Sequence, residues 1–242
     1  MFGIVGGTGL SGLASLQQSE PEQLETPYGT AYLEGGWLGE QRVVFMPRHG
    51  HPAVNPPHKI NYLANIHALR AVGVTQILAI TAVGSCDPVL EVGDFVVPDQ
   101  IIDYTYNRSH TFFEDEISHI DFTNPYTETL RQQFIQAAAS VPDVNCIAAG
   151  TYGCTNGPRL ETAAEVRRLF RDGCTIVGMT AMPEASLARE AGLEYAGLSV
   201  VVNKGAGLDG ELDLEEISAS LDASMAKVVQ VISGVVNVEQ PG

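Results

Sequence analysis

The feature that most constrains the fold is a continuous apolar run, QILAITA at residues 76–82. A strand with one solvated face alternates apolar and polar residues, whereas a strand of a parallel sheet covered on both faces is apolar throughout. The run is far shorter than the roughly 18 residues that a membrane-spanning helix needs. It therefore predicts the central strand of a sheet that carries helices on both faces.

The rest of the chain alternates between strand-like and helix-like patterns. We predict strands at residues 2–5, 94–102, 148–154, 175–179 and 193–203, and an antiparallel hairpin formed by 31–33 and 41–46. We predict helices at residues 61–72, 127–139, 162–171, 183–191 and 214–236, and a long functional or interface loop at 104–126. This alternation indicates an α/β fold: a single domain over residues 1–242, with a central mixed, mostly parallel sheet flanked by helices on both faces.

Composition argues against several classes of partner. With a formal net charge of -16 and only 13 Lys and Arg residues, the chain is not expected to bind nucleic acid, which requires clustered cations. The six His residues lack the spacing of a metal site, and the four Cys residues form no C-x-x-C, so we expect no metal and reduced thiols. No basic segment precedes the short apolar N-terminus, so we expect no signal peptide, no membrane partner and a cytoplasmic location.

A glycine-rich loop follows the first predicted strand, where residues 7–12 read GTGLSG and fit the pattern G-x-G-x-x-G. A dinucleotide fold needs a full crossover helix after this loop, and an acidic residue after a second parallel strand. Pro21 and the hairpin pattern leave little room for that helix, and Glu25 follows no second strand. The alternatives to an NAD-dependent oxidoreductase are a bare tight turn, or a loop whose N–H groups and Thr8 hydroxyl hold a phosphate-sized anion.

Further candidate ligands for an anion follow three other predicted strands. Arg48 and His49 come directly after the hairpin, and Thr81 and Ala82 end the central run. Thr180 follows another strand. In an open α/β sheet, ligands bind outside the carboxyl ends of the strands, so we expect these residues to converge. Arg48 is the main candidate because its planar guanidinium matches the oxygens of phosphate.

Several segments resemble the trimeric purine nucleoside phosphorylase and methylthioadenosine phosphorylase family. In chain order they are GGTG at 6–9, PRHGH at 47–51, NYLAN at 61–65, TAVGS at 81–85, GD at 93–94, HIDF at 119–122, GPRLETAAE at 157–165 and VGMTAMPE at 177–184. The resemblance covers residues 3 to about 230. It implies phosphorolysis, in which phosphate attacks C1′ of a purine nucleoside and releases the free base, with no metal or organic cofactor.

The resemblance also implies roles for individual residues. The expected phosphate ligands are Thr8, Arg48, His49, Thr81, Ala82 and Thr180, and the expected nucleoside contacts are Met179, Leu160, Glu161, Asn203, Lys204, Gly205, Leu214 and His119. Of these, Asn203, Glu161, Arg48 and His49 are expected to take part in catalysis. The expected partners are the purine nucleoside and phosphate. The expected assembly is a homotrimer or a hexamer built from two trimers, in which His119 reaches a neighbouring subunit's site.

Three positions predict the substrate. Asn203 stands where adenine-cleaving relatives have Asp, and Glu161 matches the glutamate that accepts from N1–H of a 6-oxopurine. Leu214 falls at the start of the last helix, where relatives that prefer a 5′-hydroxyl have His, and an apolar side chain favours a methylthio group. These residues predict phosphorolysis of S-methyl-5′-thioinosine to hypoxanthine and 5-methylthioribose 1-phosphate. The alternatives are an inosine and guanosine phosphorylase, a 5′-methylthioadenosine phosphorylase, and a non-catalytic nucleoside-binding module.

Overall fold

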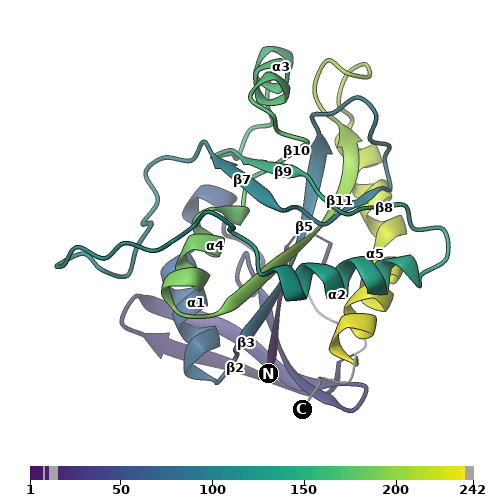
Figure 1. Cartoon of the computed structure of the whole chain (residues 1–242). Coiled ribbons are helices and arrows are strands. Elements are labelled where there is room, and N and C mark those ends of the chain that lie inside the picture. Colours follow the sequence, from purple (N-terminus) through teal and green to yellow (C-terminus); the bar gives the residue numbers. More distant parts are fainter. Residues whose placement is uncertain (8, 11–15, 238–242) are drawn as a thin grey trace.

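A computed structural model describes residues 1–7, 9–10 and 16–237 of the chain, and Figure 1 shows its arrangement. Strand β5 (Gln76–Ser85) contains the apolar run and lies in the middle of the sheet. It pairs in parallel with β1 (Phe2–Gly6) on one edge and with β11 (Glu194–Lys204) on the other. The predicted central strand is therefore confirmed.

The sheet has eleven strands among the described residues, and its main path runs β2-β3-β4-β1-β5-β10-β9-β7. The other strands on this path are β2 (Gln17–Thr26), β3 (Gly29–Leu38), β4 (Gln41–Pro47), β7 (Gln100–Asp103), β9 (Thr151–Cys154) and β10 (Ile176–Gly178). A branch through β11 adds β6 (Phe95–Val96) and β8 (Cys146–Ile147). Six of the ten pairings in the described part of the chain are parallel, so the sheet is mixed and mostly parallel, as predicted.

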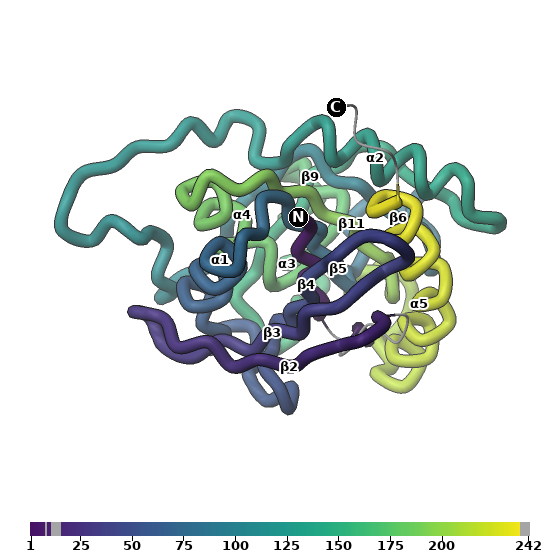
Figure 2. The backbone as a smooth tube through the Cα atoms, turned by 90° about the horizontal axis from the view of Figure 1, so that it is seen from below, coloured from purple at the N-terminus to yellow at the C-terminus, as the bar shows by residue number. Residues whose placement is uncertain are grey.

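Side chains of β5 alternate between two hydrophobic cores, because successive residues of a strand point to opposite faces. Ile77 and Ala79 lie in the core that packs against α1 (Tyr62–Ala71) and α4 (Ala181–Glu190). Leu78 and Ile80 lie in the core that packs against α2 (Glu128–Ala139) and α5 (Leu214–Val236). Figures 1 and 2 show these pairs of helices on opposite sides of the sheet, which confirms the predicted fold class.

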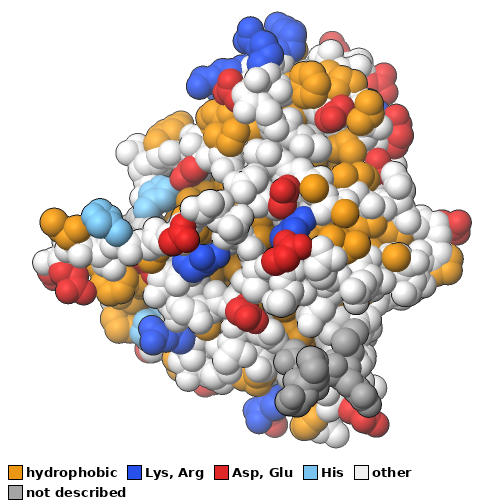
Figure 3. Space-filling view, viewed as in Figure 1, with side chains coloured by type: hydrophobic (Ala, Val, Ile, Leu, Met, Phe, Trp, Pro, Cys, Tyr) orange, Lys and Arg blue, Asp and Glu red, His pale blue; other side chains and the backbone are white. Residues whose placement is uncertain are grey.

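Two helices differ from the others in composition. Helix α5 is, within the described ranges, the one helix long and apolar enough to cross a membrane by length and composition. Its buried residues, such as Val228 and Val235, pack against the sheet, as in a core helix. Helix α3 (Ala163–Arg171) lies at the top of Figure 1 and carries three exposed arginines, and Figure 3 shows Lys and Arg side chains gathered at the top of the same view.

Two predictions about the strands are wrong. Strand β2 was not predicted, because it has Pro21 in its middle and is almost entirely exposed, so it shows no apolar alternation. Proline is tolerated there because β2 is an edge strand that pairs only with β3. The single strand predicted at 94–102 is two short strands, β6 and β7, which are separated at Pro98. The loop at 104–126 contains no helix or strand, as predicted.

The topology excludes the dinucleotide interpretation of the glycine loop. The neighbours of β1 are β4 and β5, whereas β2, the next strand along the chain, pairs antiparallel with β3. A dinucleotide fold requires the next strand to be parallel and to follow a crossover of a dozen or more residues, but only ten residues separate Gly6 from Gln17. Thr8 lies outside the described residues.

The close packing of β10 against β9 can be tested at Gly178. A Cβ at Gly178 would lie 2.0 Å from Oη of Tyr152, which is buried. We expect Gly178→Ala to lower the free energy of unfolding by about 1–3 kcal/mol, as overpacked cores do. Thermal unfolding measures the loss. Gly35→Ala is the control, because a Cβ there meets open space, and adding Tyr152→Phe to Gly178→Ala should recover part of the loss.

Candidate active site

A cavity of about 210 Å³ lies at the carboxyl ends of β1, β4, β5, β10 and β11. Five strands therefore contribute to one site, as expected for an open α/β sheet. It is lined by Gly7, Arg48, His49, Pro57, residues 81–84, Leu160, Glu161, residues 177–180, Val202, Asn203, Gly205, Ala206, Leu212, Leu214, Ile217 and Leu221. Most of the residues singled out in the sequence are in this lining.

Arg48, His49 and Gly7 lie together at one end of the cavity. A Cβ at Gly7 would lie 2.9 Å from Nη1 of Arg48 and 3.9 Å from Nε2 of His49. The Nδ1 of His49 lies 2.8 Å from the backbone oxygen of Asn55, so a neutral ring donates there and keeps Nε2 as an acceptor. Burial lowers the pKa of His49, and the neighbouring Arg48 lowers it further. The neutral imidazole is therefore more favoured here than in a free histidine.

Hydroxyl groups from two other strand ends complete this end of the cavity. Thr81 is buried, and its Oγ1 lies 2.9 Å from Oγ of Ser199, the residue opposite it on β11. Thr180 occupies the N-cap position of α4, but its side chain makes no capping hydrogen bond. Its hydroxyl is buried and is not used to cap the helix. Ala82 lies beside Thr81 in the lining. The backbone N–H groups and hydroxyls here could hold a tetrahedral anion.

The opposite end of the cavity contains two groups that could recognise a base. Glu161 accepts a hydrogen bond from Oγ1 of Thr155 at 2.6 Å, which leaves its second carboxylate oxygen for a ligand. Asn203 donates from Nδ2 to the backbone oxygen of Lys204 at 2.8 Å, which leaves Oδ1 and one N–H. The register of β11 shifts between Val201 and Asn203, and this bulge turns Asn203 over Gly84, where a Cβ would lie 3.2 Å from its Nδ2.

The remaining wall is apolar. Met179 packs against Gly157, where a Cβ would lie 2.5 Å from its sulfur. Leu214, Ile217 and Leu221 line the cavity from the first two turns of α5. These residues share one face of the helix because they are three and four positions apart. Further lining comes from Leu160, Gly205, Ala206 and Leu212.

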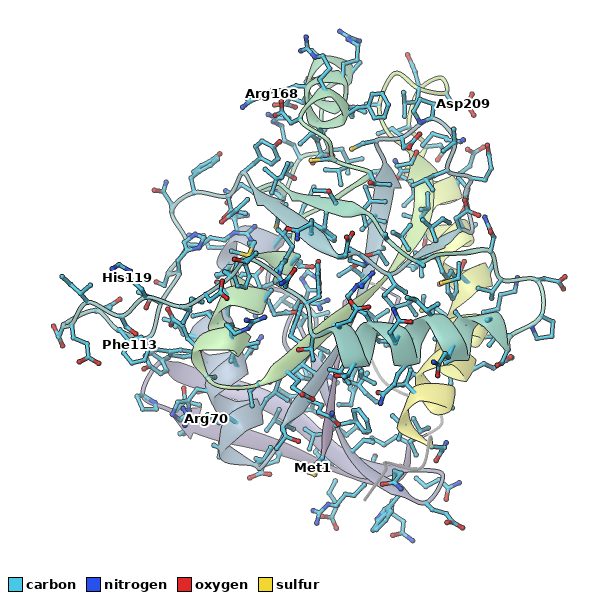
Figure 4. All side chains as sticks on the ribbon, viewed as in Figure 1. Met1, Arg70, Phe113, His119, Arg168 and Asp209 are labelled. Carbon is cyan, nitrogen blue, oxygen red and sulfur yellow. The ribbon has the colours of Figure 1, made fainter. Side chains whose placement is uncertain are left out.

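Two candidate residues lie outside the cavity. The ammonium of Lys204 contacts Oε1 of Glu91 at 2.8 Å and the backbone oxygen of Pro88 at 3.1 Å. The interpretation of Lys204 as a nucleoside ligand is therefore not supported, since the side chain clamps a loop instead. His119 is exposed on the 104–126 loop, which projects away from the sheet in Figure 4, so it does not reach this chain's own cavity.

Comparisons with known proteins identify relatives of this chain. A family model described as the phosphorylase superfamily matches residues 1–237. A probable S-methyl-5′-thioinosine phosphorylase from Pseudomonas syringae pv. tomato is 46% identical over 246 residues, which cover 98% of each chain. A 6-oxopurine nucleoside phosphorylase from Pyrococcus furiosus is 42% identical over 238 residues, covering 95% of this chain and 89% of the relative.

Solved structures show the same likeness. The methylthioadenosine phosphorylase of Schistosoma mansoni, in complex with adenine, superposes with a TM-score of 0.92 at 32% identity, covering 97% of this chain and 90% of that one. The chain belongs to the phosphorylase superfamily. It is an enzyme of the nucleoside phosphorylase type, and the resemblance inferred from its motifs is confirmed.

The structure of this phosphorylase also reveals Arg108, which the sequence analysis missed. Arg108 donates from Nη1 to the backbone oxygen of Met179 at 2.9 Å and from Nη2 to that of Asn156 at 2.9 Å. It also contacts Oη of Tyr62 at 3.2 Å. Arg108 therefore ties the 104–126 loop to the cavity wall. A lone arginine in an aperiodic loop gave no signal for this role.

The tight approach at Gly7 generates a test of the phosphate end. In Gly7→Ala, the added methyl would lie beside Nη1 of Arg48, in the space that an anion would need. We expect the KM for phosphate to rise about tenfold or more, because ligand contacts are lost, while the KM for the nucleoside changes little. Initial rates at varied phosphate and fixed nucleoside measure this. An unchanged phosphate KM would place the anion elsewhere.

Proposed function

We propose that this phosphorylase cleaves S-methyl-5′-thioinosine with phosphate, giving hypoxanthine and 5-methylthioribose 1-phosphate. The observation that carries the proposal is that one cavity contains both Glu161 and Asn203 and has an apolar wall formed by side chains of α5. The names of the relatives support both the 6-oxopurine base and the 5′-methylthio group of the proposed substrate. The Pseudomonas relative is a probable S-methyl-5′-thioinosine phosphorylase, and the Pyrococcus relative is a 6-oxopurine nucleoside phosphorylase.

The proposed base contacts follow from donor and acceptor chemistry. The carboxylate of Glu161, oriented by Thr155, accepts from N1–H, which hypoxanthine has and adenine lacks. The amide of Asn203 donates to N7 or O6 and thereby stabilises the negative charge that the departing base acquires. A carboxylate at this position would instead favour a 6-amino group. The site therefore selects 6-oxopurines.

The proposed sugar contacts separate a methylthio group from a hydroxyl. Met179 packs against the ribose, and Leu214 and Ile217 face the 5′ end from α5. A hydroxyl buried against these side chains would lose its hydrogen bonds to water, whereas a methylthio group loses none. One such apolar contact contributes about 1–3 kcal/mol of discrimination.

In the proposed mechanism the protein forms no covalent bond with the substrate. It orients phosphate toward C1′ and stabilises the charges that develop in the transition state. Arg48, His49, Thr81, Ala82 and Thr180 hold phosphate below C1′, together with Thr8. The transition state resembles an oxocarbenium ion, so a fixed phosphate oxygen both stabilises the cation and is aligned for attack. The bond from C1′ to the base nitrogen breaks as the bond to the phosphate oxygen forms. Phosphate is thus a co-substrate, and the reaction needs no cofactor.

The proposed assembly and compartment extend this model. We place His119 at the 5′ end of a neighbouring subunit's site in a homotrimer or hexamer, which suits its exposed position on a projecting loop. The chain acts as one nucleoside phosphorylase domain over residues 1–242. All four cysteines are unpaired, which fits a reducing cytoplasm.

A side-by-side assay tests the substrate. With phosphate present, we expect kcat/KM for S-methyl-5′-thioinosine to exceed that for inosine by about tenfold or more, as an apolar pocket predicts. Activity on 5′-methylthioadenosine should be weaker still, because adenine offers no N1–H to Glu161. Base release is followed by absorbance. Comparable rates on inosine would favour the general 6-oxopurine phosphorylase, and dominant activity on methylthioadenosine would refute the base contacts.

A substitution at Asn203 tests the proposed base contact directly. We expect Asn203→Asp to raise the ratio of kcat/KM for 5′-methylthioadenosine over S-methyl-5′-thioinosine by about tenfold or more, since a carboxylate accepts from a 6-amino group but cannot donate to O6. Asn237→Asp makes the same chemical change on an exposed residue beyond the end of α5 and is the control. If the ratio stays constant in both variants, Asn203 does not select the base.

A further inference from the structure

A buried carboxylate lies behind the phosphate end of the cavity. Glu184 belongs to α4, in which every residue from Ala181 to Ala188 is buried. Glu184 is 2% exposed and Arg48 is 1% exposed. Burying a charge is costly unless it is paired and hydrogen-bonded, so a charge in this otherwise apolar stretch needs an explanation. Glu184 is not part of the cavity lining.

Glu184 accepts from the two adjacent N–H groups of the Arg48 guanidinium, on Nε and Nη2, that were expected to bind phosphate as a fork. Nε of Arg48 donates to Oε2 of Glu184 at 2.6 Å, and Nη2 donates to Oε1 at 2.9 Å. Nη1 donates to the backbone oxygen of Ile80 at 2.9 Å, and Nη2 contacts that of Val5 at 3.4 Å. Of the five N–H groups, these partners leave one on Nη1, the atom closest to the Cβ position of Gly7.

Tyr195 holds Glu184 in turn. Its Oη donates to Oε1 of Glu184 at 2.9 Å, and its ring stacks on that of Tyr126 with centroids 5.9 Å apart. Because Tyr195 lies on β11 and Ile80 on β5, the network fixes Arg48 to the two central strands. Burial alone would lower the pKa of Arg48, but Glu184 outweighs that effect and raises it, so the guanidinium stays charged.

We propose that Glu184, held by Tyr195, is a positioning residue for phosphate. It fixes the guanidinium so that a single Nη1–H of Arg48 faces the anion, and it cancels the charge of Arg48. Phosphate is then gripped by hydrogen bonds in a rigid frame that needs no rearrangement when the transition state forms. The inference rests on the proposed function insofar as phosphate is the co-substrate.

The test is Glu184→Gln. A carboxamide keeps the shape of the side chain, but its NH₂ group cannot accept from Arg48, so one bond of the fork is lost and the charge of Arg48 is no longer cancelled. We expect the KM for phosphate to rise about tenfold or more, and the KM for the nucleoside to change less than about twofold. Calorimetric titration with inorganic phosphate alone should show the same weakening.

A pair of phenylalanine variants separates this role from general stability. Tyr195→Phe removes the hydroxyl that holds Glu184 and should raise the phosphate KM by about two- to fivefold, the effect of one lost hydrogen bond. Tyr126→Phe removes the hydroxyl of the ring stacked on Tyr195, leaves Glu184 untouched and should leave the phosphate KM unchanged. If Glu184→Gln does not fold, this pair decides the question.

The outcomes are distinct. A folded Glu184→Gln with a normal or lowered phosphate KM overturns the proposal, because charge rather than positioning would then dominate. An equal rise in the KM of both substrates also overturns it. Tyr195→Phe and Tyr126→Phe behaving alike also overturns it. A failure of the proposed function reads differently: the wild-type enzyme would release no base in the presence of phosphate, although calorimetry could still show phosphate binding that depends on Glu184.

Discussion

The parallel pairing of β5 with β11 is the constraint on which the site depends. Ten residues of β5 pair with β11, and Thr81 stands directly opposite Ser199. The register places Thr81, the proposed phosphate ligand, and Asn203, the proposed base contact, along the same pair of strands. The bulge before Asn203 lets β11 pair with β5 and also line the cavity. It turns the side chain of Asn203, which would otherwise lie in the core, toward the cavity.

A buried ion pair then sets the electrostatics of this frame. Arg48 and Glu184 are 136 residues apart in the sequence, and removing one partner of such a pair costs about 3–5 kcal/mol because the other charge is left buried. With Arg48 paired and the pKa of His49 lowered, the end of the cavity near Arg48 is rich in donors without being strongly cationic. In this acidic chain of net charge -16, an anion bound there would therefore be held by hydrogen bonds rather than by excess positive charge.

How far the fold could be predicted depended on the burial of each element. Strands β5 and β11 are mostly buried and largely apolar, and α3 begins at the capping box of Thr162 and Glu165, so these elements were easy to recognise. Strand β2 was missed because an exposed edge strand has no core-facing alternation. How well the site could be predicted also depended on local sequence patterns. Residues at strand ends were found, whereas Arg108 and Glu184 act through backbone oxygens and buried partners that no local pattern reveals.

Hydrophobic periodicity and short motifs are local properties of a sequence, so they were enough to predict the α/β class, the positions of the main strands and helices, the family, and many of the residues that line the cavity. The contacts that those residues make depend on the packing of the whole chain. It gave the fork of Arg48 to Glu184, directed Lys204 to Glu91 and turned Asn203 over Gly84. These are contacts between distant parts of the chain, and they form only when the strands and helices pack together.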